Sequence, residues 1–130
     1  MTDYSPEEYS EYRLQRALET IKEVETHIEN EFWNTAVNRM YYACFYAVGA
    51  LLIKHDVAPS THSGVRQKFG QLFVKTGKIN RTLAKHYTDL FEKRNKGDYN
   101  DFFDYDGDTV KSLLPPTIDL IDQIKELIEV

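Results

Sequence analysis

The 130-residue sequence has few of the residues that build covalent or metal cross-links. Its one cysteine, Cys44, cannot form an internal disulfide, and neither a cysteine pair nor a His-x-x-x-His spacing is present to hold a metal. Six glycines and four prolines exclude a collagen-like or low-complexity chain. We therefore expect one domain over residues 1–130 with an apolar core, no metal and no cofactor. Cys44 lies in an apolar run and is interpreted as a small buried hydrophobe.

Long hydrophobic runs are also absent. The longest uncharged stretch, residues 40–53, has 14 residues, whereas a membrane-spanning helix needs about 20. We interpret this stretch as part of a core helix. The sequence opens with residues 1–4 and turns acidic, without the basic and apolar stretches of a secretory leader. We therefore expect a cytoplasmic protein that has no membrane partner.

The net charge of −5 is unevenly distributed along the sequence. Residues 64–96 contain nine Lys or Arg against two acidic residues, a net charge of +7, so the remainder carries −12. The acidic total argues against indiscriminate nucleic-acid binding, but the basic segment is suited to form a local phosphate-binding face. Two solvated helix faces balanced by acidic neighbours would give the same pattern, and the sequence leaves both interpretations open.

Helical periodicity organises the whole chain. Apolar residues recur at three- and four-residue steps and no stretch alternates with a period of two, so we expect helices and no strands. The apolar stripes predict five helices, over about residues 6–28, 33–55, 62–76, 81–97 and 110–128. Short connections between amphipathic helices favour antiparallel neighbours. The predicted fold is all-α, an up-and-down helical bundle of four main helices plus a shorter fifth, and the second helix is apolar enough to be its centre.

Local signals mark the helix ends. Ser5 and Asn80 are placed to cap the first and fourth helices, and Gly77 suits a left-handed residue after the third. Pro115 and Pro116 either kink the last helix or mark its true start, and both readings stay open.

The loop over residues 98–108 is acidic and aromatic. Its three large rings belong to Phe102, Phe103 and Tyr105. A monomer would have difficulty burying all three in a polar loop, so we predict that they pack at a dimer or partner surface. The alternative is that they fold back over the end of the bundle.

Arg94 stands out because it continues an apolar stripe. Counting by threes and fours from Leu83 through Tyr87 and Leu90 arrives at Arg94, and Asp98 follows one turn later on the same face. A guanidinium on an apolar face needs partners, and Asp98 is the nearest candidate. Two interpretations remain: an ion pair that closes the helix end, or an arginine held to bind phosphate or to stabilise a developing anion.

Three segments resemble, in order and spacing, the small stand-alone HEPN proteins: residues 36–47 (AVNRMYYACFYA), 60–65 (STHSGV) with Phe69, and 94–99 (RNKGDY). The resemblance covers about residues 10–128. It implies a HEPN-like bundle that pairs into a homodimer and is encoded beside a minimal nucleotidyltransferase in a toxin–antitoxin or stress-response module. It also implies RNA or a nucleotide as ligand, since many HEPN proteins are metal-independent RNases with an Arg-x-x-x-x-His motif.

The sequence departs from that motif at its histidine. Arg94 matches the arginine, but Tyr99 stands five residues later, and no histidine follows His86. An imidazole titrates near neutral pH, whereas a phenol with a pKa of about 10 is a poor base there. The resemblance thus gives Arg94, Asp98 and Tyr99 as candidate catalytic residues while weakening the case for cleavage. In related modules the nucleotidyltransferase adds AMP to a tyrosine just beyond the motif, which implies Tyr99 or Tyr105 as acceptor.

Further binding candidates flank these residues. Asn38 and Arg39 lie at the family's Arg-x-Tyr-Tyr position, with pairing to a neighbouring helix as the alternative, and Lys93 and Lys96 adjoin Arg94. His62 is interpreted as a cap or packing residue near a helix start, with a role as acid or base as the alternative.

Three hypotheses follow for the function. The leading one is a homodimeric module that binds RNA or nucleotide and works with a nucleotidyltransferase partner. The second is an active metal-independent RNase toxin that uses Arg94, with a tyrosine or histidine from elsewhere as base. The third is a degenerate dimeric scaffold without ligand binding.

Overall fold

The computed structural model describes residues 5–129 and consists of helices joined by short connections. The helices are α1 (Pro6–Glu29), α2 (Trp33–Lys54), α3 (His62–Phe69), α4 (Arg81–Tyr99) and α5 (Gly107–Glu129), and a π-helical turn, Gly70–Val74, continues α3. No strand occurs within residues 5–129, so the predicted all-α fold is confirmed. Residues 1–4, which bear on the prediction about a leader, lie outside the described residues.

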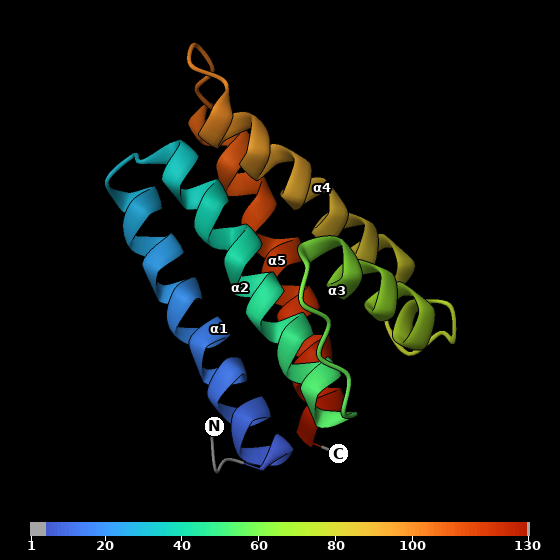
Figure 1. The fold of residues 1–130 in the computed structure, drawn as a ribbon. Helices are drawn as coiled ribbons and strands as arrows, with labels where there is room; N and C mark the ends of the chain where they lie inside the picture. The colour runs from blue at the N-terminus through green and yellow to red at the C-terminus, as the bar shows by residue number, and fades with distance from the viewer. Residues whose placement is uncertain (1–4, 130) are drawn as a thin grey trace.

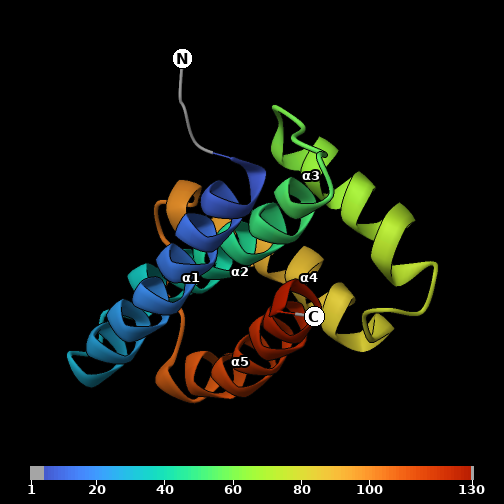
Figure 2. The same ribbon diagram turned by 90° about the horizontal axis from the view of Figure 1, so that it is seen from below.

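The four long helices alternate in direction around a central α2 (Figure 1). α1 and α4 run upward in that view, and α2 and α5 run downward. Seen from below, α1, α4 and α5 surround α2, while α3 and its π-helical turn lie to one side next to α4 (Figure 2). This is the predicted up-and-down bundle of four main helices with a shorter fifth.

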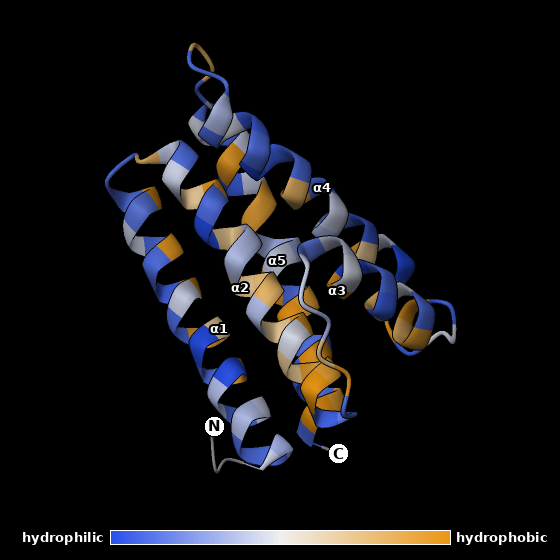
Figure 3. Ribbon diagram, viewed as in Figure 1, coloured by the Kyte–Doolittle hydropathy of each residue, from blue (hydrophilic) through white to orange (hydrophobic). Residues whose placement is uncertain are grey.

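α2 occupies the centre because apolar residues cover most of its circumference. Figure 3 shows apolar residues concentrated along the lower half of α2 and along α5, whereas α1 and α4 are largely hydrophilic. A stripe of small residues on α2 includes Ala43, Ala47 and Ala50, all fully buried. The Ser10 hydroxyl on α1 donates to the Ala50 carbonyl at 2.7 Å, so this stripe faces α1 and lets the two helices approach closely.

α2 is also long and apolar enough to cross a membrane by length and composition, but 61% of its apolar window is buried inside the bundle. Its interpretation as a core helix is confirmed. Cys44 is fully buried in it, as predicted, and burial raises the pKa of its thiol.

Capping residues set several helix ends. The Ser5 hydroxyl accepts from the Glu8 N–H at 3.1 Å, and the Asn80 side chain accepts from the Thr82 N–H at 2.8 Å, as predicted. Gly77 adopts the expected positive φ of 81°.

Two helix ends differ from the predictions. The helix predicted over residues 62–76 stops as an α-helix at Phe69, and the Lys75 N–H then bonds the Gly70 carbonyl at 2.8 Å. This i→i+5 bond widens one turn without disturbing the apolar stripe, so periodicity does not reveal it. α4 continues to Tyr99, two residues past the predicted end, because Gly97 remains helical.

Pro115 and Pro116 lie inside α5 and do not mark its start. The start is set by Asp106, whose carboxylate accepts from the Thr109 N–H at 2.7 Å. The two prolines leave the carbonyls four residues earlier, at Lys111 and Ser112, without helical donors. Both of those residues are exposed, so water can satisfy the carbonyls and the helix continues.

The side chain of Asn34 on α2 attaches the connection between α4 and α5 to the bundle through hydrogen bonds. Its amide nitrogen donates to the Phe103 carbonyl at 2.9 Å and to the Gly97 carbonyl at 3.3 Å, and its oxygen accepts from the Tyr105 N–H at 2.9 Å. Tyr105 is only 8% exposed, and its hydroxyl donates to the Lys93 carbonyl at 2.9 Å. The segment thus folds back over the end of the bundle.

This arrangement corrects the prediction for the loop aromatics. Tyr105 belongs to the core, and the partly buried Phe103 ring packs edge-on against it with ring centroids 4.7 Å apart, so both follow the alternative of folding back over the end of the bundle. The reason lies in Asn34. Its side chain forms hydrogen bonds with the Phe103 carbonyl and the Tyr105 N–H, which would otherwise need water as a partner, so this part of the loop can be buried. Phe102 remains fully exposed.

Candidate functional site

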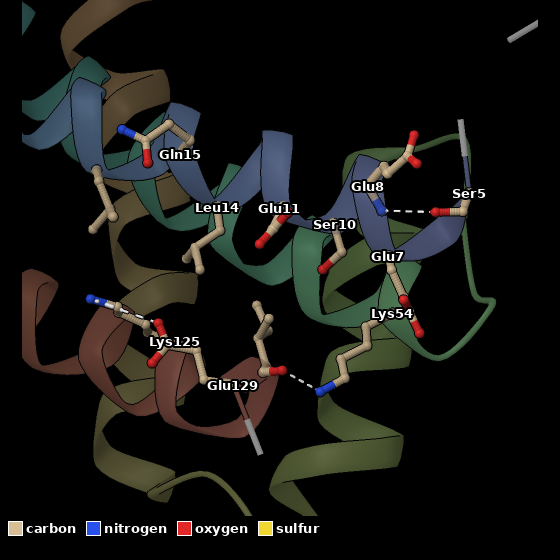
Figure 4. A pocket seen from close by; sticks show the side chains of 12 residues that line it. Ser5, Glu7, Glu8, Ser10, Glu11, Leu14, Gln15, Lys54, Lys125 and Glu129 are labelled. Carbon is tan, nitrogen blue, oxygen red and sulfur yellow. Dashed lines mark hydrogen bonds and ion pairs between the residues drawn. The ribbon is translucent and has the colours of Figure 1, made fainter. Parts of the chain in front are cut away.

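The cavity between α1 and α5 does not contain the predicted site. It has a volume of about 670 Å³ and lies between the first half of α1 and the end of α5 (Figure 4). Its charged lining comprises four carboxylates and two ammonium groups, those of Glu7, Glu8, Glu11, Glu129, Lys54 and Lys125. The excess of negative charge disfavours a phosphate ligand, and no predicted site residue lines this cavity.

Arg94 on α4 is held in one orientation by three neighbours. Its Nε lies 3.3 Å from an Asp98 carboxylate oxygen, so the ion pair given as one of the two interpretations of their spacing is present. Its Nη1 donates to the Asn95 side chain and its Nη2 to the Tyr42 hydroxyl, both at 2.7 Å. Each terminal nitrogen keeps a second N–H, and the side chain is 14% exposed. The guanidinium is thus preorganised with donors left over for an anion.

Three tyrosine rings surround this guanidinium. The central guanidinium carbon, Cζ of Arg94, lies 5.2 Å from the ring centroid of Tyr42, 5.6 Å from that of Tyr41 and 5.8 Å from that of Tyr99. These distances are those of cation–π interactions. Tyr99 is 74% exposed, so its phenol stands in solvent beside Arg94, unlike the buried phenol of Tyr105.

The remaining predicted residues divide into two groups. Asn38 reaches the site, because its amide donates to the Asp98 carboxylate at 2.9 Å. Arg39 instead pairs with Glu23 on α1 at 3.7 Å, the alternative given for it, although its guanidinium also lies 5.2 Å from the Tyr42 ring centroid.

Two predicted lysines lie toward the loop. The Lys96 ammonium sits 4.3 Å from the ring centroid of Phe103, and the Lys93 carbonyl accepts from Tyr105.

His62, at the start of α3, belongs to the same site. Thr61 rather than His62 caps α3, since its hydroxyl accepts from the Gly64 N–H at 2.9 Å. His62 Nδ1 lies 2.6 Å from the Tyr41 hydroxyl, and the imidazole stacks on Phe45 with centroids 4.4 Å apart. His62 is therefore a packing residue, as interpreted from the sequence, and it packs on the same tyrosine rings that Arg94 contacts.

Burial lowers the pKa of His62, and the charges of Arg94 and Arg66 lower it further, so the imidazole is neutral at pH 7. Burial raises the pKa of Tyr41 to about 12, so its hydroxyl keeps its proton. The guanidinium of Arg66 lies 4.1 Å from the ring centroid of Phe91, and its Nη1 is buried without a hydrogen-bond partner among residues 5–129. The site therefore holds two guanidinium groups, one neutral imidazole and one carboxylate.

The model of the HEPN domain family matches residues 10–127. The chain belongs to the HEPN family. It is 41% identical over 123 residues to a "UPF0332 protein" of Thermotoga maritima, covering 95% of this chain and 93% of that one. Two proteins of Methanocaldococcus jannaschii named "putative toxin" are 32% and 34% identical to it. Those matches cover 67% and 66% of this chain, and 59% and 64% of theirs.

In this HEPN protein the position five residues after Arg94 holds a tyrosine, yet a histidine from another helix contacts the same rings. His62 lies with its ring centroid 5.8 Å from that of Tyr41 and 6.1 Å from that of Tyr42. A fixed guanidinium can bind a phosphate, and a neutral imidazole can exchange a proton near pH 7.

Proposed function

We propose that this HEPN protein acts in a toxin–antitoxin or stress-response module by binding RNA or a nucleotide at the Arg94 site. The observation that carries the proposal is the fixed orientation of Arg94, whose spare N–H groups suit a phosphate oxygen. Exposed Tyr99 adds a ring on which a base can stack. The names of the two M. jannaschii relatives support the toxin part of the proposal.

The proposal includes a homodimer and a minimal nucleotidyltransferase as partner. Two aromatic side chains near the end of α4, Tyr99 and Phe102, are exposed, and exposed aromatics of this kind are typical of protein interfaces. Of the two candidate AMP acceptors, Tyr99 is the accessible one, because the Tyr105 hydroxyl is bonded to a carbonyl inside the fold. Light scattering of the purified protein tests the dimer. Incubation with a co-encoded nucleotidyltransferase and ATP, followed by mass mapping, tests the acceptor.

Binding is tested by titrating a labelled single-stranded RNA and, separately, AMP into wild-type protein and Arg94→Ala. Loss of a charge-assisted contact is expected to weaken binding roughly tenfold or more. The dependence of affinity on salt should also become weaker in Arg94→Ala. The slope of log affinity against log salt concentration should decrease in magnitude by about the amount that one phosphate contact contributes.

Arg81→Ala is the matched control, because Arg81 is an exposed arginine on the same helix, about 20 Å from Arg94 along the axis at 1.5 Å per residue. The control should bind like wild type. Equal affinity of Arg94→Ala and wild type would contradict the proposed site. If the wild-type protein binds neither RNA nor AMP, the binding proposal is wrong and the hypothesis of a dimeric scaffold without ligand binding remains.

A further inference from the structure

We infer that the cavity between α3 and α4 is the docking site for the exposed Phe102 of a second copy of this chain, and that the contact is reciprocal. The inference rests on the homodimer of the proposed function and assigns the two surfaces that form it. Its basis is a basic cavity with apolar walls and an exposed phenylalanine between aspartates, both on the same protomer.

The cavity lies where α3 and its π-helical turn meet the first half of α4. Its volume is about 250 Å³, and its walls include Phe69, Val74, Ala84 and the ring of Tyr87. An apolar cavity of about 150 Å³ accommodates a benzene ring, so this cavity is large enough for one phenylalanine side chain.

The charged residues that line the cavity are all basic. They are Arg66, Arg81 and Lys85, and no acidic residue of the described chain lines it. Arg81 is exposed and has no hydrogen bond or ion pair within residues 5–129, whereas Lys85 pairs with Asp89 at 3.0 Å. Apolar walls beside an unpaired positive charge are complementary to an acidic segment that carries one large apolar side chain.

The segment after α4 has this chemistry. Phe102 is fully exposed, and Asp101 and Asp104 flank the pair of phenylalanines. Both carboxylates are exposed and form no hydrogen bond or ion pair within residues 5–129. Asn34 holds the backbone at residues 103 and 105, so Phe102 is presented from a fixed loop and loses little conformational entropy on docking.

The positions of the two surfaces on α4 make the contact reciprocal. The loop extends beyond the end of α4, whereas the cavity lies beside its first half (Figure 1). A protomer does not fill its own cavity, because Thr88 in the cavity and Tyr99 at the end of α4 are about 17 Å apart along the axis at 1.5 Å per residue. A two-fold axis across the middle of α4 places each loop beside the cavity of the other protomer, so both contacts form together.

Sedimentation equilibrium of the full chain tests the contact by measuring the Kd of the dimer. We expect Phe102→Ala to raise this Kd about 100-fold or more, because each dimer loses two buried anchors. The monomer should keep the helical content of wild type, since the ring is fully exposed within its own chain. Tyr12→Ala is the matched control, because it removes an exposed ring from α1, and its Kd should stay within about threefold of wild type.

Filling the cavity tests the other side of the contact. Gly70 lines the cavity, and a Cβ added there would meet no atom within 4 Å. Gly70→Leu should therefore fold and raise the Kd about as much as Phe102→Ala. The double variant should be no weaker than either single variant, because both changes remove the same contact. Effects that multiply in the double variant would contradict the contact.

A charge exchange tests the pairing at the entrance of the cavity. Asp101→Arg and Arg81→Asp should each raise the Kd roughly tenfold, because each places like charges together. Combined in one chain they should bring the Kd back to within about threefold of wild type. Failure of the combined variant to recover would exclude this pairing.

An engineered disulfide reports the position of the loop directly. The variant with Thr88→Cys and Asp101→Cys should form a covalent dimer on mild oxidation, because a disulfide requires the two Cα atoms to be about 4.4–6.8 Å apart. The variant with Tyr12→Cys and Asp101→Cys should remain monomeric on a non-reducing gel. Cys44 is fully buried and takes no part.

The outcomes distinguish this contact from the proposed function. Wild-type protein that is monomeric at every concentration would overturn both the homodimer and the contact. A dimer whose Kd is unchanged by Phe102→Ala and Gly70→Leu would overturn the contact alone, and the homodimer would use another surface. If Phe102→Ala leaves the dimer intact but abolishes binding of the nucleotidyltransferase, Phe102 docks on that partner and the inference is wrong.

Discussion

Replacing Asn34 by alanine is expected to release the segment that joins α4 to α5. The side chain makes three part-buried hydrogen bonds, to the Gly97 and Phe103 carbonyls and from the Tyr105 N–H. Each such bond contributes about 1 kcal/mol net, and water can recover part of the loss, so the free energy of unfolding should fall by about 2 kcal/mol. For a chain of this size that corresponds to a decrease in Tm of about 6–10 °C.

Urea unfolding followed by circular dichroism measures this effect. Asn34→Asp keeps the acceptor for Tyr105 but places a carboxylate against two carbonyl oxygens, so it should be at least as destabilising as Asn34→Ala. Asn30→Ala is the control, because the Asn30 side chain makes one exposed hydrogen bond at the end of α1, and it should cost less than about 0.5 kcal/mol. If Asn34→Ala also stays within about 0.5 kcal/mol of wild type, Asn34 does not hold the loop.

Three other predictions follow from particular contacts. Gly97→Ala should not give the gain of about 1 kcal/mol usual in a helix, because its Cβ would lie 3.3 Å from the Tyr105 ring; thermal melts measure this. The NMR titration of His62 should have its midpoint below 6.5, and Arg66→Met should raise it. Because the folded state binds this proton less readily than the unfolded state, the His62 contribution should lower stability as pH falls below about 6.5. Cys44 should react with a thiol reagent only as the protein unfolds, and rapid labelling of native protein would contradict its burial.

The helices were predictable because their determinants are local. The ion pair between Arg94 and Asp98 follows from a four-residue spacing, and Ser5 caps α1 through a contact three residues away. The fate of the loop aromatics was not predictable in this way. Tyr105 is held by Asn34, 71 residues earlier, and no periodicity encodes that contact.

His62 shows the same limit within the candidate site. The motif after Arg94 has Tyr99 in place of histidine, and His62 lies 32 residues before Arg94 in a separate matching segment. The surroundings of His62 depend on its 2.6 Å contact with the Tyr41 hydroxyl, on the packing of α3 against α2 and on the contact of Arg66 with Phe91 of α4. The matching segment 60–65 indicated that the histidine belongs to the family pattern, but only the packing of three helices shows what it contacts.

The structure also bears on the basic segment of residues 64–96. Arg94 is partly neutralised by Asp98, whereas Arg66 forms no ion pair within residues 5–129. The site thus offers an anion about one or two positive charges, not the full excess of the segment, while the chain as a whole carries −5. With a slope of about 0.7 per neutralised phosphate on a single strand, log affinity should fall by about 0.7 to 1.4 per tenfold rise in salt. A much steeper dependence would mean that RNA follows the outer lysines of α4 instead of entering the Arg94 site.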